Sequence, residues 1–394
     1  MAQVLINETT LTNIADAIRE KNGATETYKP SEMAPAIQEL TMASGGIEDS
    51  LVDKSIAPSV ISYTNDRVSQ VSSYAFYGLK GLQEVSFPNA TAVGLNAFTS
   101  CEDLTSIDLP LVETVRKGAF SSTVSLTEMT FPKLTYLPGE AFINSGITTI
   151  NAPLLEAIGT SAADYATTST GGAFYQSNIT NLNLPKLSII GPYTFYYRSR
   201  LTNISLPSLE TVKANGFESC KALTTINMPK IFTIEKNAFK NCSSLSNVTF
   251  NPSGFTAGDY AFDGCNFSTL RLNLTTTAEI NNMAHLNLGY RCFANNKNLT
   301  SVKIIANSGV PTQFSLDGNV FYGCENLTSV VIKIPTTTDS THPINIPDNA
   351  FANCPNLTSI KVSWSKAWQE ADGYLDNAPW GATNATVTYN YTGS

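Results

Sequence analysis

A phenylalanine, usually preceded by a small residue, recurs through most of this chain at intervals of about 22 residues, with longer intervals where extra residues separate two units. The twelve anchor phenylalanines are Phe76, Phe98, Phe120, Phe142, Phe174, Phe195, Phe217, Phe239, Phe262, Phe293, Phe321 and Phe351. A unit of this length cannot enclose a core alone, so each unit must cover the apolar edge of the next. The repeat therefore predicts a solenoid.

A short apolar pattern follows each anchor by five or six residues and favours a β-strand. It reads apolar-x-x-apolar-x-apolar and often ends in Pro, as in residues 104–110 (LTSIDLP) and 223–229 (LTTINMP). Alternation and β-branched residues favour a strand over a helix. One strand per unit, all running in the same direction, predicts a parallel sheet. Leu104, Ile107 and Leu109 would face inward, and the anchor phenylalanines would form a second core column.

The unit resembles the BspA-type leucine-rich repeats, whose pattern is approximately L-x-x-I-x-L-P-x-x-L-x-x-I-G-x-x-A-F-x-x-C-x-x-L-T-S-I. Residues 104–120 are close to one copy, and the resemblance covers residues 67–363. It implies a leucine-rich-repeat solenoid with a parallel β-sheet and mostly irregular or short-helical returns. Such repeats serve as general recognition scaffolds, so the resemblance implies binding without naming a ligand.

Six of the seven cysteines share one repeat position, three residues after an anchor: Cys101, Cys220, Cys242, Cys265, Cys324 and Cys354. No paired C-x-x-C spacing is present, so a disulfide framework or a metal site has no support. We expect free thiols that pack as small buried hydrophobes in one column.

Residues 1–40 lack the repeat and predict a small α-helical module. Leu11, Ile14 and Ile18 recur with helical periodicity, and a second short helix would present Met33 and Ile37. Two helices of this length bury too little surface to be stable alone. We therefore take these five residues as candidate attachment residues.

The start of the chain carries a second resemblance. The string LINETTLTNIADAIREKNG at residues 5–23, followed by YKPSEMA at 28–34, is similar to the N-terminal module of tail-associated structural proteins of bacteriophages and prophages from Gram-positive gut bacteria. This resemblance implies attachment to a virion tail component, with an exposed recognition part following. No secretory signal is visible, so we expect production in the host cytoplasm and location in the virion tail.

The remaining boundaries follow from composition and from where the repeat stops. The expected order is a helical attachment module at 1–40, a Gly-rich linker at 41–50, an N-terminal cap at 51–66, a solenoid of about twelve units at 67–363, and a C-terminal cap at 364–394.

Both the C-terminal region and the interruptions of the repeat suggest further surface features. Trp364, Trp368 and Trp380 are expected to cover the last coil, with a sugar platform on Trp364 or Trp368 as the alternative. Extra residues predict loops on one side of the solenoid, where binding is common, at 160–170, 275–288, 306–317 and 336–346.

The outward strand position changes in charge along the chain. It is Asp108 early, and Arg271, Lys303 and Lys361 late. On a solvated sheet face such a gradient would orient an anionic glycan or a charged partner. Solubility with sequence drift explains the same pattern. We take these four residues as candidate ligand-binding residues.

A second candidate set is aromatic, because tyrosine offers a rigid apolar face with a polar end. Tyr175 and Tyr196 directly follow anchors, and Tyr165, Tyr193 and Tyr197 cluster near the first interruption. Packing along the solenoid flank explains these five tyrosines equally well.

Composition argues against several functional classes. A formal charge of −8 argues against a nucleic-acid-binding surface. Only two histidines, His285 and His342, are present, which weakens acid–base and zinc chemistry. No nucleotide-binding, metalloprotease or EF-hand motif occurs. We expect no enzymatic activity, no cofactor, no bound metal and no membrane-spanning segment.

We therefore predict a non-enzymatic, phage tail-associated recognition protein that binds a host-surface glycan or protein through the solenoid. The alternatives are a bacterial cell-surface adhesin and a phage-encoded intracellular protein-interaction scaffold. Oligomeric state is left open, with a homo-oligomer among the options.

Overall fold

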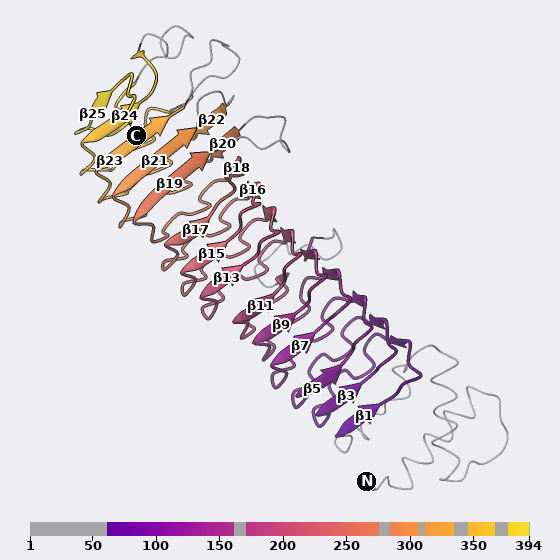
Figure 1. The fold of residues 1–394 in the computed structure, drawn as a ribbon. Helices are drawn as coiled ribbons and strands as arrows, with labels where there is room; N and C mark the ends of the chain where they lie inside the picture. The colour runs from indigo at the N-terminus through magenta and orange to yellow at the C-terminus, as the bar shows by residue number, and fades with distance from the viewer. Residues whose placement is uncertain are drawn as a thin grey trace, which may run out of the picture. The chain divides into compact units, whose positions relative to one another are not determined.

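The computed structural model describes residues 61–160, 171–275, 284–306, 312–334, 346–366 and 377–393. The chain forms two compact units, Met1–Pro185 and Lys186–Ser394. Each unit is a stack of coils, and most coils contribute a main strand and a second, return strand (Figure 1). The predicted helical module with its five attachment residues, the linker and Tyr165 lie outside the described residues.

The main strands form parallel ladders in both units. In the first unit they are β1 (Ser62–Thr64), β3 (Glu84–Ser86), β5 (Ser106–Asp108), β7 (Glu128–Thr130), β9 (Thr149–Asn151) and β11 (Asn181–Asn183), in sheets ordered β1-β3-β5 and β7-β9-β11. The register advances by one unit per coil, since Ser62 pairs with Glu84 and Glu84 with Ser106. The predicted parallel sheet is confirmed.

The second unit continues the same pattern with longer strands toward its C-terminal end. Its main strands are β13 (Asn203–Ser205), β15 (Thr225–Asn227), β17 (Asn247–Thr249), β19 (Thr269–Leu274), β21 (Ser301–Ala306), β23 (Ser329–Lys333), β24 (Ser359–Val362) and β25 (Thr386–Thr388). They form sheets ordered β13-β15-β17 and β19-β21-β23-β24-β25. The sheet is therefore interrupted between β17 and β19.

The expectation of one strand per unit is wrong, because a return strand follows most main strands. In the first unit the return strands are β2 (Gln70–Val71), β4 (Ala92–Val93), β6 (Thr114–Val115), β8 (Tyr136–Leu137) and β10 (Ala157–Ile158). In the second unit they are β12 (Ile189–Ile190), β14 (Thr211–Val212), β16 (Thr233–Ile234), β18 (Gly254–Ala257), β20 (Ala284–Leu288) and β22 (Thr312–Leu316). Part of the predicted loops at 275–288 and 306–317 is therefore strand.

The anchor phenylalanines form the second core column that the repeat predicts. Consecutive rings stack nearly parallel in each unit, with centroids 5.1 Å apart for Phe76 and Phe98 and 4.9 Å apart for Phe195 and Phe217. The other core column comes from the main strands and the residues beside them: Leu104 and Leu109 flank β5 and are buried, and Ile107 within β5 is half-buried. Each coil thus covers the apolar edge of its neighbour, as a short unit requires.

The turn around each anchor is shaped by residues in the left-handed region. In the coil of Phe98, Asn96 and Ser100 have φ of 51° and 61°. The backbone N–H groups of Asn96, Phe98 and Ser100 each donate to a carbonyl of the next coil, at 3.1, 2.8 and 2.9 Å. The turns therefore bond coil to coil, and left-handed backbone recurs two residues before and two residues after the anchors.

The cysteine column is buried and its thiols are free, and they do more than pack. The Sγ of Cys242 donates to the carbonyl oxygen of Phe217 in the preceding coil at 3.1 Å, and Cys101 makes the equivalent bond to Phe76 at 3.0 Å. Burial raises the pKa of the Cys101 thiol to about 12. All six thiols of the column donate to an anchor carbonyl of the preceding coil, a role that their packing alone does not reveal.

Candidate functional site

Three of the four predicted charged residues lie in one column of the second unit. Arg271 on β19 pairs in register with Lys303 on β21, and Val331 on β23 separates Lys303 from Lys361 on β24. Asp108 lies on β5 of the first unit, where its carboxylate accepts a hydrogen bond from Ser86 Oγ at 3.0 Å. The structure thus assembles the three cations and leaves Asp108 in a different setting.

Lys333 joins these cations from the next outward position of β23, opposite Ile305 of β21. Sequence reasoning missed it because a main strand of three residues would end before it, whereas β23 has five residues. Alternation along a longer strand places residues two apart on the same face. We call Arg271, Lys303, Lys333 and Lys361 the basic strip.

The basic strip has no acidic residue among the outward positions of its sheet. Those positions, taken over the described strands β19, β21, β23, β24 and β25, hold only Ser, Thr, Asn, Ile, Val, Lys and Arg. Like charges directly opposite each other on neighbouring strands destabilise a sheet. Arg271 and Lys303 bring like charges into register on the outward face of the sheet.

The four cations differ in how they are held. Lys361 lies with its Nζ 4.9 Å from the ring centroid of Tyr391, and Lys333 Nζ donates to the carbonyl of Thr392 at 3.3 Å. The Lys303 ammonium makes no hydrogen bond or ion pair within the part of the chain that the structure describes. Arg271 donates through its Nε to Asn273, so the strip combines three cations held by neighbouring groups with the uncompensated Lys303.

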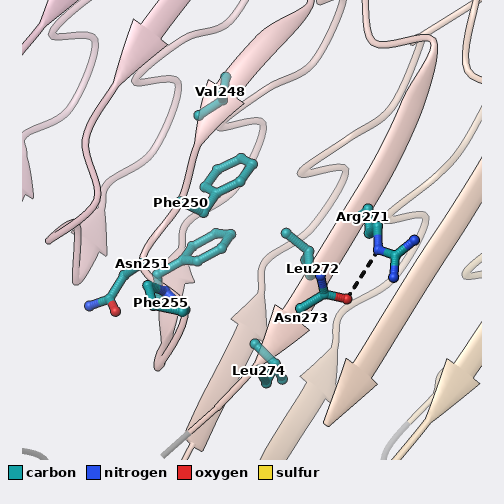
Figure 2. A pocket seen from close by; sticks show the side chains of 9 residues that line it. Val248, Phe250, Asn251, Phe255, Arg271, Leu272, Asn273 and Leu274 are labelled. Atoms are coloured by element: carbon teal, nitrogen blue, oxygen red, sulfur yellow. Dashed lines mark hydrogen bonds between the residues drawn. The ribbon is translucent and has the colours of Figure 1, made fainter. Parts of the chain in front are cut away.

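Arg271 also borders a small cavity beside the free edge of β19. The cavity has a volume of about 220 Å³. In Figure 2, Leu272 and Leu274 point toward the rings of Phe250 and Phe255, while Arg271 bonds Asn273 through its Nε at 3.2 Å. Outward and inward residues alternate along β19 in the same way. The cavity thus lies at the sheet interruption, with apolar side chains on one part of its lining and Asn251, Arg271 and Asn273 on another.

Three of the five predicted tyrosines cluster in the second unit. The rings of Tyr193 and Tyr196 lie 5.6 Å apart and those of Tyr196 and Tyr197 lie 4.6 Å apart, both in edge-to-face contact. Tyr197 is 52% exposed. Tyr175 lies in the first unit, where its hydroxyl accepts a hydrogen bond from Gln176 Nε2 at 3.4 Å.

The tyrosine cluster continues into charged residues of the following coils. Glu218 and Lys240 occupy the position directly after their anchors, as Tyr196 does, and Lys240 Nζ lies 5.0 Å from the ring centroid of Tyr260. Burial raises the pKa of Glu218, and the Lys240 ammonium partly opposes this shift. Burial also raises the pKa of Tyr196, with the Glu218 carboxylate adding to it. We call Tyr193, Tyr196, Tyr197, Glu218, Lys240 and Tyr260 the turn ridge.

Sequence reasoning found the tyrosines of the turn ridge through their proximity in the chain. It missed Glu218, Lys240 and Tyr260, although their shared offsets from the anchors were visible. The missing signal was that residues directly after an anchor line up across coils on the outer side of the turn.

Two further observations concern chemistry outside these surfaces. Among the described residues, no group of three or more His, Cys, Asp or Glu side chains is placed to hold a metal ion. In the same ranges, no helix is long and apolar enough to cross a membrane.

Several solved structures are similar to this chain. A leucine-rich repeat protein from Bacteroides ovatus ATCC 8483 is 17% identical, with 82% of this chain and 87% of that chain covered and a TM-score of 0.40. A leucine-rich cell surface protein from Faecalibacterium prausnitzii A2-165 is 21% identical, with 80% and 82% covered and a TM-score of 0.32. The pneumococcal vaccine antigen PcpA is 15% identical, with 84% and 80% covered and a TM-score of 0.40.

Among curated proteins, none matches the chain significantly. The family model described as BspA type leucine rich repeat region (6 copies) matches residues 59–169, 167–287 and 279–366. These matches cover well over half of the chain and coincide with its stacked coils. The chain therefore belongs to the BspA-type leucine-rich repeat family.

Proposed function

We propose that this chain is a non-enzymatic recognition protein of the adhesin type, which binds an anionic polymer through the basic strip. The observation that carries this proposal is the strip itself, with four cations on one outward sheet face that lacks acidic residues. The protein as a whole has a formal charge of −8. Clustering of positive charge against that background favours a specific electrostatic role over general solubility.

The repeat family supports the same role, because stacked repeats present extended surfaces for partners. An anionic glycan suits the strip because its charges repeat along a chain, as the cations repeat across the strands. Single contacts of this kind are weak and are screened by salt. Several copies of the protein on one surface would raise the overall avidity.

The test measures binding of the full chain to immobilised heparin, used as a polyanion probe, by surface plasmon resonance. The double variant Lys303→Glu and Lys361→Glu should bind at least about tenfold more weakly, or about 1.4 kcal/mol. Binding of the unchanged protein should also weaken steadily as the salt concentration rises, because screening shortens the reach of the exposed cations.

A charge-matched control separates the strip from net charge. Lys221 and Lys230 are exposed lysines of the same unit outside the strip. Their double change to Glu alters net charge equally and should leave heparin binding nearly unchanged. Equal weakening in both double variants would reduce the effect to net charge and defeat the proposal.

A second candidate function is that of a tail-associated recognition protein in a bacteriophage particle. The observation in its favour is the resemblance of residues 5–23 and 28–34 to phage tail modules. The family match begins at residue 59 and lends that module no support, so the adhesin is the setting we favour. The basic strip is the proposed ligand surface in either setting.

Mass spectrometry of phage particles and antibody labelling of intact cells together separate the two settings. Peptides of this chain in purified phage particles from the producing strain would establish the tail setting, and antibody labelling of intact cells would establish the adhesin. A chain found only in the cell interior would contradict both settings and favour the intracellular scaffold.

A further inference from the structure

The turn ridge places bulky side chains where the backbone disfavours them. Tyr193, Tyr197 and Tyr260 have φ of 54°, 59° and 57°. Only glycine, and to a lesser extent asparagine and aspartate, adopts this region without strain. At equivalent positions other coils use large residues at Tyr74, Glu140, Gln176 and Arg291, and smaller ones at Asn96, Ser100, Ser122, Asn144, Asn215, Ser219, Asn237, Asn241, Asn295, Asn319 and Asn353. The fold therefore does not require tyrosine at these positions.

The same left-handed backbone carries large residues at Tyr74, Glu140, Gln176 and Arg291, so strain belongs to the coil, and what sets the turn ridge apart is the clustering of its aromatic rings. The strained tyrosines are also packed in a way that presents their rings. Tyr196 contacts Tyr193 and Tyr197 edge to face, which holds the three rings against one another. Tyr197 remains 52% exposed although its backbone is fixed by the turn. The result is a preorganised aromatic surface with hydroxyls at its rim.

Polar groups continue the ridge from coil to coil. The backbone N–H of Tyr197 donates to the carbonyl of Glu218 at 2.9 Å, and that of Ser219 donates to the carbonyl of Lys240 at 2.8 Å. These bonds align the backbones of Glu218 and Lys240 in successive coils, at the position that Tyr196 occupies in its own coil. Tyr260 follows, with Lys240 against its ring. Aromatic faces at both ends thus enclose an acceptor and a donor.

We propose that the turn ridge binds a neutral, linear glycan that runs along the stack of coils. Pyranose rings present apolar C–H faces for stacking on tyrosine, and hydroxyls that donate to a carboxylate and accept from an ammonium. The ridge extends over a row of four successive coils, spaced about 4.8 Å apart like neighbouring strands. A linear chain can follow such a row.

A protein partner fits the ridge less well. The core of a protein interface is depleted of charged side chains, whereas Glu218 and Lys240 lie between the tyrosines of the ridge. The turn positions of the four coils from Phe195 to Phe262, taken two before, one after and two after each anchor, carry no Leu, Ile, Val or Met. The ridge thus offers stacking and hydrogen bonding without an aliphatic core.

The test uses the full chain and two neutral β-linked probes, cellohexaose and chitohexaose, with saturation-transfer NMR and calorimetry. The double variant Tyr193→Asn and Tyr197→Asn installs the residue that other coils use. It should keep or raise the melting temperature, because strain is relieved, and should weaken hexasaccharide binding at least about tenfold. A purely structural role for the tyrosines predicts a lower melting temperature instead.

Two controls make the outcome decisive. Tyr74 in the first unit has the same left-handed conformation, with φ of 61°, so Tyr74→Asn relieves equal strain while leaving the ridge intact. It should not change hexasaccharide binding. Heparin binding should be unaffected by the ridge variant, which separates this site from the basic strip. Absence of binding by both probes, or equal loss in Tyr74→Asn, would overturn the proposal.

Discussion

At the scale of single residues, the position three residues after the anchor carries a polar atom toward an anchor carbonyl in most coils. Cysteine thiols fill that position in six coils, whereas Thr123, Ser145 and Ser177 fill it with hydroxyls that bond the anchor of their own coil. Buried carbonyl groups require such partners. A position that reads as small and apolar in the sequence is therefore also a hydrogen-bonding position in the fold.

Glu218 offers a residue-scale prediction on pH. Burial raises its pKa above the usual value near 4.5, so the folded protein binds this proton more tightly than the unfolded chain does. Stability from this group is therefore lost as pH rises through the window above 4.5. Glu218→Gln should stabilise the protein at pH 7, and the gain should shrink as pH falls toward 4.5. Urea unfolding at several pH values measures it.

The matched change Glu210→Gln tests whether the stabilisation by Glu218→Gln arises from the burial of the carboxylate. Glu210 is an exposed carboxylate of the same unit. Its change should bring no gain at pH 7. A gain for Glu218→Gln that stays constant from pH 7 to pH 4.5 would contradict an origin in the buried charge.

At the scale of elements, the sequence predicted the main strands and missed the return strands. The main strand is marked by alternation over several residues, as in Ser106–Asp108 with its flanking leucines. A return strand such as Ala92–Val93 has two residues, too few for any period to show. Its pairing depends on the coil being closed, which is a tertiary property that local preference does not encode.

The candidate sites, too, contain residues that the sequence predicted and residues that it did not. A constant repeat places equivalent residues in register, so the column of Arg271, Lys303 and Lys361 was predictable once a strand was assumed. Lys333 was not predictable, because the lengthening of β23 was not visible as a pattern. The contact between Lys240 and Tyr260 depends on the directions in which the turn orients its side chains. The spacing of the anchors does not determine those directions.

Two glycines with positive φ provide an element-scale prediction. Gly254 in β18 has φ of 97°, and a Cβ there would lie 1.7 Å from the carbonyl oxygen of His285 in β20. Gly78 has φ of 75° but no atom within 4 Å of such a Cβ. Gly78→Ala should cost about 1 kcal/mol from backbone strain alone. Gly254→Ala should cost roughly 3 kcal/mol or more, because β18 and β20 must also separate.

Chemical denaturation of the two variants measures the difference. The denaturant-induced unfolding of both variants should remain cooperative, since neither change alters the column of stacked phenylalanines. Equal losses of free energy would show that β20 yields to the added methyl group, contrary to the tight backbone approach that the pairing of Gly254 with His285 requires.

At the scale of the whole molecule, stability is built from contacts between neighbouring coils. The stacked rings illustrate this, because each anchor contacts the anchors before and after it in its own unit. Stability in such arrays is approximately a sum of repeat terms and nearest-neighbour terms. The chain forms two compact units, so damage to one unit need not spread to the other.

The cysteines report on the two units separately. Cys101 lies in the first unit and the other six lie in the second, and all seven are buried and free. Phe239→Ala should cost about 3–5 kcal/mol and speed pulsed alkylation of the six thiols in moderate urea more than that of Cys101. Phe98→Ala should show the reverse order, because Phe98 stacks within the first unit. Peptide mass spectrometry measures each thiol, and equal acceleration of all seven in both variants would mean that the chain unfolds as one cooperative body.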